Sequence, residues 1–349
     1  MKRDPVREAM GLSRRRFLAA SGWLAVGAAG LGLGQPVVAD AAWFDGELVR
    51  VSSARTAMGT FVNMIVFHSS RDKADEAIEK AYGEIRRLEG LLSCHDDATA
   101  VGTLNREGAL RDMPPEMAEL AVASSRFFRD SSGAFDITVK PVLDLYRRSF
   151  ESTGAPPDSR RLENAVSRMG MNHVKLDGNG MSFAKEGMSL TFDGIGKGYI
   201  VDRAMAVLRK HGIKHGLVNA GGDICVTGTR GDGKPWRVAI QDPWSPGKLV
   251  DTIEMTHGAV ATSGSYEIYF DREKQYHHLI SPRQGAPAGG VAGVSIVAPD
   301  TMTADALSTS VFVLGTNDGR KLLRGTPGVR GLILSDRGRQ ASVNWSHRV

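Results

Sequence analysis

Apolar residues recur along the chain with two different periods, which distinguish predicted helices from predicted strands. Positions 74, 78, 81, 85, 88 and 92 carry Ala, Ile or Leu at helical spacing, which predicts an amphipathic helix. Further helices are predicted over residues 115–129, 198–211 and 303–314. Alternating or β-branched runs predict strands over residues 48–51, 61–67, 216–218, 236–240 and 291–297.

The order of these elements predicts the fold class. Helices and strands do not alternate strictly, so we expect an α+β fold with mixed, largely antiparallel sheets flanked by helices. Residues 133–146 are expected to begin as a loop and continue as a short helix, and residues 152–159 to form a surface loop. No repeat or low-complexity linker divides the chain, so residues 42–349 are predicted to form one domain.

The first 41 residues have the pattern of an export signal. SRRRFL at residues 13–18 precedes a short run rich in Ala and Gly, and Ala39-Asp40-Ala41 provides small residues before Ala42. This resembles a twin-arginine signal peptide, with an uncleaved N-terminal anchor as the alternative. The sequence therefore predicts a periplasmic protein. No later run approaches the roughly 20 apolar residues of a membrane span.

Charge and cysteine content narrow the functional classes. The formal net charge is +5, but residues 43–349 hold 38 basic and 36 acidic residues, so most of the excess lies in the leader. Without a basic stripe on the predicted domain, we expect no nucleic-acid partner. The two cysteines, Cys94 and Cys225, leave disulfide pairing open. No cluster of Cys and His has the spacing of a transition-metal site, which argues against zinc and haem.

Three short segments have residues suited to chemistry. Thr191 and Gly198 break the phosphate-loop pattern that GIGKG at residues 194–198 superficially resembles, so this segment is either a tight turn or a phosphate-binding turn. Asp305 and Thr309 lie on one face of a predicted helix and suit Mg²⁺, although a charge that favours the helix dipole is the alternative. His277 and His278 precede a Pro-Arg turn and include candidate proton acceptors.

Seven segments in order resemble the ApbE family of FAD:protein FMN transferases. Together they span most of the chain after the leader, and Gly285 follows the sixth. The segments are AMGT at 57–60, GAFD at 133–136, DGIGKGY at 193–199, VNAGGD at 218–223, ATSGSY at 261–266, HLISPR at 278–283 and ADALST at 304–309.

The resemblance implies a single catalytic domain that binds FAD and Mg²⁺. Such an enzyme transfers FMN, through its phosphate, to a Thr or Ser hydroxyl of a target protein and releases AMP. By position, Gly194, Asp305 and Thr309 would hold Mg²⁺, with Gly194 acting through its carbonyl. The residues that would contact FAD are Met58, His95, Ala134, Phe135, Asp136, Thr191, Lys197 and Ile280.

The proton acceptor is assigned as a hypothesis. We expect His278 to accept the proton of the target hydroxyl, with Asp193 as the rival group. Phosphoryl transfer depends mainly on positioning and charge neutralisation, to which Lys197 and Mg²⁺ would contribute.

Three positions depart from the family pattern. His95 stands where members usually have an aromatic residue, and Thr191 and Ser281 stand where most have Asp. The segment TFDGIGKG at 191–198, whose acid is Asp193, resembles the NosX-like branch, which is associated with nitrous-oxide respiration. Its partner would be a periplasm-facing membrane flavoprotein with an acceptor of the type D-x-x-[ST]-G-A-[ST]. The alternatives are an FAD pyrophosphatase and a non-catalytic periplasmic flavin-binding assembly factor.

Overall fold

The structure is a computed structural model that describes residues 43–44, 48–245 and 247–347. The predicted leader, residues 1–41, lies outside the described residues. Within those residues, no helix is both long and apolar enough to cross a membrane. The helices are α3 (Arg71–Leu92), α4 (Ala100–Glu107), α5 (Pro115–Asp130), α6 (Lys140–Thr153), α7 (Ser159–Ser167), α8 (Gly196–Lys210) and α9 (Thr301–Arg324).

A nine-stranded sheet forms the centre of the molecule, and every neighbouring pair in it is antiparallel. This confirms the predicted α+β class. The spatial order is β1 (Trp43–Phe44), β2 (Leu48–Ala57), β3 (Thr60–His68), β7 (His215–Ala220), β8 (Asp223–Thr227), β11 (His257–Gly264), β14 (Val291–Ala298), β15 (Arg330–Ser335) and β16 (Gln340–Val343).

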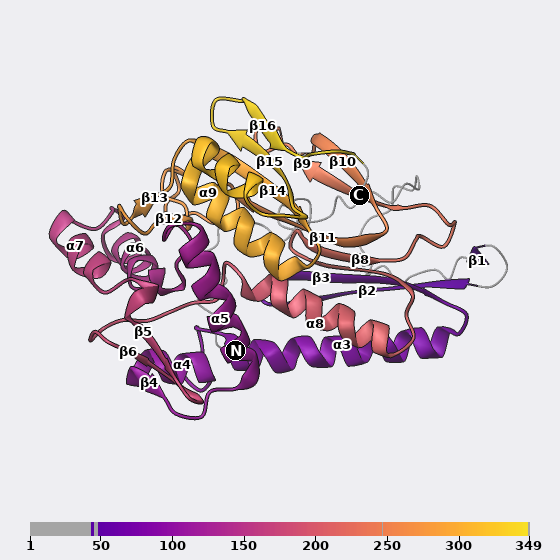
Figure 1. Cartoon of the computed structure of the whole chain (residues 1–349), viewed down its shortest axis with the longest axis horizontal. Coiled ribbons are helices and arrows are strands. Elements are labelled where there is room, and N and C mark those ends of the chain that lie inside the picture. The colour runs from indigo at the N-terminus through magenta and orange to yellow at the C-terminus, as the bar shows by residue number, and fades with distance from the viewer. Residues whose placement is uncertain (1–42, 45–47, 246, 348–349) are drawn as a thin grey trace, which may run out of the picture.

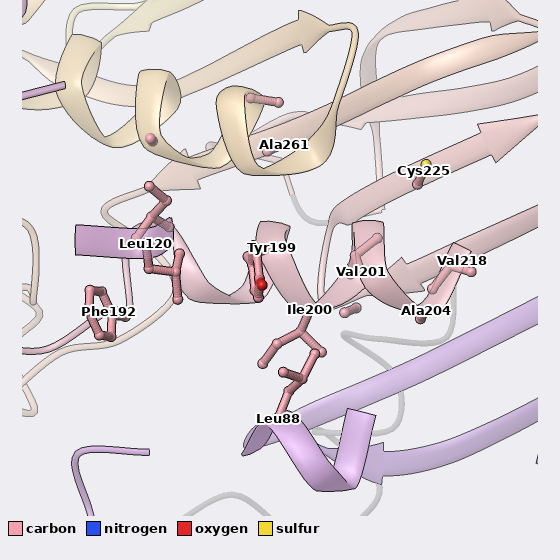
Figure 2. Packing of buried hydrophobic residues seen from close by; sticks show 14 of the residues in the cluster. Leu88, Leu120, Phe192, Tyr199, Ile200, Val201, Ala204, Val218, Cys225 and Ala261 are labelled. Carbon is pink, nitrogen blue, oxygen red and sulfur yellow. The ribbon is translucent and has the colours of Figure 1, made fainter. Parts of the chain in front are cut away.

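Different elements cover the two faces of this sheet. Helices α3, α8 and α9 pack side by side on one face (Figure 1). Figure 2 shows Ile200 of α8 pointing toward Leu88 of α3 within this core. The hairpin of β9 (Trp236–Gln241) and β10 (Leu249–Met255) covers the other face, where Leu217 and Val226 join its cluster. Adjacent strand residues face opposite sides, so Val218 belongs instead to the helical face.

The chain between α3 and α8 forms a smaller lobe at one end of the sheet (Figure 1). It contains α4 to α7 and a three-stranded sheet of β4 (Ala109–Leu110), β6 (Gly180–Phe183) and β5 (Val174–Asp177). Two short 3₁₀ turns (Ile137–Val139 and Met171–His173) also belong to it. The pair of β12 (Ile280–Ser281) and β13 (Ala286–Pro287) comes from later in the chain and packs against α6 and α7 through Ile280. The loops between the lobe and α8 therefore lie beside the sheet's helical layer.

The predicted elements are present, but several boundaries were wrong. The short helix expected near residue 146 is the 14-residue α6, and the helix expected to end at residue 314 continues to Arg324. It passes Gly315, whose φ of 76° and ψ of 179° bend it. Strand β11 was missed because Gly, Ala and Ser dominate it, and these residues have weak strand propensity.

Candidate functional site

The first turns of α8 and α9 lie together and cap each other. Asp305 of α9 accepts a hydrogen bond on Oδ2 from the N–H of Gly198, at 3.0 Å. In return, Asp202 of α8 accepts the N–H groups of Thr301 and Met302, at 2.8 and 2.9 Å. These carboxylates satisfy backbone donors that a helix N-terminus leaves unpaired. The arrangement holds the glycine-rich turn against the Asp305 carboxylate.

The close approach of the two helices requires glycine at position 198. A Cβ built there would lie 2.7 Å from the carbonyl carbon of Thr301 and 2.9 Å from Cβ of Asp305, and nearer still to the Thr301 oxygen. A side chain at this position would therefore force α8 away from α9. GIGKG is a turn leading into a helix, and one of its glycines has a packing role.

Four charged groups gather beside this turn. Lys197 Nζ forms an ion pair of 2.9 Å with Asp223 Oδ2, and Asp305 and Glu267 are close enough to act on the same ammonium. Burial alone would lower the pKa of Lys197, but the carboxylates of Asp223, Asp305 and Glu267 outweigh it and raise that pKa. The site thus fixes a permanent cation next to the N-terminus of α8.

The carboxylates of this cluster outnumber its cation. Burial, followed by repulsion from Asp223, raises the pKa of Asp305 well above its ordinary value. Glu267 lies near Lys197 and Asp223, whose charges act on its carboxylate. Loss of hydration raises its pKa to about 7, although Lys197 opposes this. Three carboxylates beside one ammonium make their full ionisation unfavourable. A bound divalent cation would favour the ionised carboxylates and balance their negative charge.

Oxygen groups suited to such a cation lie next to Asp305. Thr309 follows it by one helical turn, and Gly194 is packed against Thr309, since a Cβ on Gly194 would lie 3.3 Å from Thr309 Oγ1. Ser263 Oγ lies 3.3 Å from the same hydroxyl. Carboxylate, hydroxyl and carbonyl oxygens form the hard donor set that Mg²⁺ prefers. The donor chemistry and the local charge of Gly194, Asp305 and Thr309 therefore fit Mg²⁺.

A second group of side chains lies where the loop after α3 meets the loop before α8. The thiol of Cys94 donates to Thr191 Oγ1 at 3.4 Å, and that oxygen also accepts the N–H of Asp193 at 3.1 Å. His95 is exposed, with Nε2 3.8 Å from Cys94 Sγ. Burial, and then the Asp193 charge, raises the pKa of the Cys94 thiol. The structure thus brings His95, Thr191 and Asp193 together around the Cys94 thiol.

The candidate base His278 lies close enough to both groups for the charges of Lys197 and Asp193 to act on its ring. Its Nδ1 lies 3.3 Å from the carbonyl oxygen of Ile268, an atom that can only accept. Nδ1 therefore carries the proton and Nε2 keeps a free lone pair. Burial lowers the pKa of His278 to about 4; His277 and Lys197 contribute, while the Ile268 bond and Asp193 oppose this. The ring is therefore neutral at pH 7 and able to accept a proton.

The other predicted contacts have mainly structural surroundings. Met58 has φ of 52° in the β2–β3 turn and donates its N–H to Glu89 Oε1 at 2.8 Å. Asp136 Oδ1 accepts the N–H and hydroxyl of Thr138, and burial raises the Asp136 pKa. Ala134 and Phe135 are buried, and Phe135 borders Gly194. The buried side chain of Ile280 packs in a separate apolar cluster with α6 and α7.

Sequence reasoning gave no role to three acids of the site. Asp223, Glu267 and Asp202 become prominent only because the sheet and helices bring their side chains to Lys197 or to α9. The one sequence signal for a functional acid was at Asp223, whose carboxylate directly follows Gly221 and Gly222, since a glycine turn allows the backbone to approach a ligand closely.

Known proteins resemble this chain in sequence and in fold. The model of the ApbE family matches residues 58–333. A Treponema pallidum protein named FAD:protein FMN transferase is 32% identical over 85% of this chain and 88% of its own length. A Klebsiella pneumoniae protein of the same name is 30% identical over 76% and 79%.

Solved structures give the same picture. The ApbE protein of Thermotoga maritima has a TM-score of 0.77 and 31% identity, and the match covers 84% of this chain and 97% of that one. The flavinyl transferase ApbE of Pseudomonas stutzeri has a TM-score of 0.74 and 28% identity, covering 85% and 96%. The family model, the relatives and the matched fold together show that the chain belongs to the ApbE family.

Proposed function

We propose that this protein is a FAD:protein FMN transferase. One observation carries the proposal: the first turn of α8, with Lys197, meets the Asp305–Thr309 face of α9 in a chain of the ApbE family. A helix N-terminus, a fixed cation and a set of hard oxygen ligands together suit a pyrophosphate. FAD would be the substrate whose pyrophosphate lies there.

In the proposed reaction, the Thr or Ser oxygen of a target protein attacks the phosphorus on the FMN side of FAD. The bond between that phosphorus and the bridging oxygen breaks, and AMP leaves with the bridging oxygen. Lys197, held by Asp223, would face the phosphate charge. Asp305, Thr309 and the Gly194 carbonyl would hold Mg²⁺, which neutralises charge on the pyrophosphate oxygens.

His278 would take the proton of the target hydroxyl. Its neutral ring has Nε2 available because Nδ1 is held by the Ile268 carbonyl. A pKa of about 4 makes it a weak base in the free protein. The negative pyrophosphate would offset Lys197, one of the charges that lower this pKa, and so strengthen the base. Asp193 remains the rival acceptor.

The proposal includes a partner and a compartment, both based on the sequence. The target would be a periplasm-facing membrane flavoprotein with a D-x-x-[ST]-G-A-[ST] acceptor, and the NosX-like features suggest one that serves nitrous-oxide respiration. Export through the twin-arginine signal would place the enzyme in the periplasm. Met58, His95, Ala134, Phe135, Asp136, Thr191 and Ile280 remain the predicted FAD contacts.

The test is in-gel flavin fluorescence after denaturation in SDS. The purified protein is incubated with FAD, Mg²⁺ and an acceptor bearing a D-x-x-T-G-A-T segment, and AMP is measured in parallel. A fluorescent acceptor band that disappears with EDTA or in Asp305→Ala supports the transferase. AMP release with a dark acceptor would instead indicate an FAD pyrophosphatase, and tight FAD binding without AMP release would indicate a carrier.

The same assay separates the two candidate bases. His278→Ala is expected to slow transfer by about 100-fold or more, 100-fold being the lower end of the range for general base catalysis, with FAD affinity unchanged. Asp193→Asn is the matched comparison, since it removes the rival acceptor. Normal turnover in His278→Ala together with a loss in Asp193→Asn would assign the proton transfer to Asp193.

A further inference from the structure

The loops that precede α8 and follow α3 bring together a thiol, an imidazole and a carboxylate. Cys94 Sγ, one ring nitrogen of His95 and one carboxylate oxygen of Asp193 all lie within 4.8 Å of one another. Neither the spacing of Cys and His in the sequence nor the ApbE resemblance points to this grouping. Asp193 is 98 residues from His95 in the chain and joins it only in the folded protein.

We propose that Cys94, His95 and Asp193 form a binding site for Zn²⁺ at the edge of the flavin site. The donor set decides the class of metal. Thiolate and imidazole are ligands for zinc and related borderline cations, whereas Mg²⁺ takes hard oxygen ligands. The Zn²⁺ site is therefore chemically distinct from the oxygen group of Gly194, Asp305 and Thr309.

The distances are close to those of a tetrahedral site. Zinc bonds of about 2.3 Å to sulfur and about 2.0–2.1 Å to nitrogen place the two ligand atoms roughly 3.6 Å apart. Cys94 Sγ and His95 Nε2 are 3.8 Å apart without a metal. The remaining pairs lie within 4.8 Å and need to shorten by at most about 1.5 Å to reach this geometry. Asp193 is exposed, so a change of its side-chain rotamer can provide that movement.

Binding has a defined stoichiometry of ions and protons. Zn²⁺ binds the thiolate, so the proton that Cys94 now donates to Thr191 Oγ1 leaves to solvent when the Zn–S bond forms. Three protein ligands leave a fourth position for water. The ion would then link the loop after α3 to the loop before α8, two segments already joined by the Cys94–Thr191 contact.

The consequence for catalysis rests on the proposed function. His95 occupies the position from which family members stack on the flavin, and Asp193 is one of the two candidate bases. A bound zinc ion would hold both side chains away from those roles. We therefore expect Zn²⁺ to inhibit transfer in the presence of excess Mg²⁺, because the two cations occupy different ligand sets.

The direct test uses Co²⁺ as a spectroscopic probe of untagged full-length protein, without FAD or acceptor. A thiolate-to-cobalt charge-transfer band should saturate at one equivalent, persist in excess Mg²⁺, and disappear when Zn²⁺ displaces the cobalt. Cys94→Ser should abolish the band, and His95→Ala should weaken binding by more than about 100-fold, since losing even an outer-shell partner costs about 10–100-fold. Cys225→Ser is the matched control, because Cys225 is buried in β8.

The outcomes separate this proposal from the proposed function. Absence of a charge-transfer band, or a band that survives in Cys94→Ser, would overturn the zinc site whether or not the protein transfers FMN. A band with the expected behaviour supports the site even if no acceptor is flavinylated. Where transfer is observed, inhibition by Zn²⁺ in the wild type but not in Cys94→Ser assigns the inhibition to this site. Equal inhibition of both proteins would refute that assignment.

Discussion

Replacing Gly198 by Ala tests whether the contact of α8 with α9 builds the site. The new Cβ would lie 2.7 Å from the carbonyl carbon of Thr301, whereas carbon atoms normally approach to about 3.5 Å. The two helices would have to separate by roughly 0.8 Å. The bond of 3.0 Å between Gly198 N–H and Asp305 Oδ2 would lengthen with them.

The magnitude combines opposing effects. Overpacking costs about 1–3 kcal/mol, and weakening a hydrogen bond to a carboxylate adds about 1 kcal/mol. Replacing a helical glycine by alanine returns up to about 1 kcal/mol. We therefore expect Gly198→Ala to lower the free energy of unfolding by about 1–3 kcal/mol. The Asp305 carboxylate would also shift relative to Lys197, so FMN transfer should fall as well.

Gly83→Ala is the matched control for this substitution. Gly83 lies inside α3, and a Cβ built there meets no atom within 4 Å. The same chemical change should therefore stabilise the protein by about 0.5–1 kcal/mol. Urea unfolding of both variants, with unchanged m values, measures whether each substitution raises or lowers the free energy of unfolding. A Gly198→Ala protein as stable as Gly83→Ala would refute the packing explanation.

Three further predictions concern the charged groups of the site. Asp305→Asn should lower FMN transfer by about 100-fold or more, measured by in-gel fluorescence across a Mg²⁺ series, because it removes several kcal/mol of charge stabilisation; full activity would argue against the metal role. Asp202→Asn should lower the free energy of unfolding by about 1–2 kcal/mol in urea, since an amide has one acceptor oxygen for the two N–H groups of Thr301 and Met302. The pKa of His278 is lowered to about 4, so between pH 4 and its ordinary 6.5 the unfolded chain binds a proton that the folded chain does not. The stability that this group contributes is lost as the pH falls through that window. The free energy of unfolding of His278→Gln should therefore rise relative to that of the wild type over the same range. A difference between the two proteins in urea unfolding that does not change with pH would contradict this.

Much of the secondary structure was determined by local sequence. The apolar spacing from Ala74 to Leu92 gave α3, and Pro115 marked the start of α5, because burial of one helix face repeats every three to four residues. Strand β11 was not predicted from the sequence, because its small residues pack well only between β8 and β14. Such a strand is stabilised by its neighbours rather than by its own propensity.

The candidate site divides in the same way. The sequence by itself determined that Asp305 and Thr309 share a helix face, since one turn of an α-helix fixes that relation. The sequence also contains, in the same order, the segments that identify the ApbE family. Only the tertiary structure decided that Asp223 holds Lys197 and that Cys94 and His95 lie beside Asp193. These contacts join residues far apart in the chain, and the antiparallel sheet with its packed helices, rather than any local pattern, sets the distances between them.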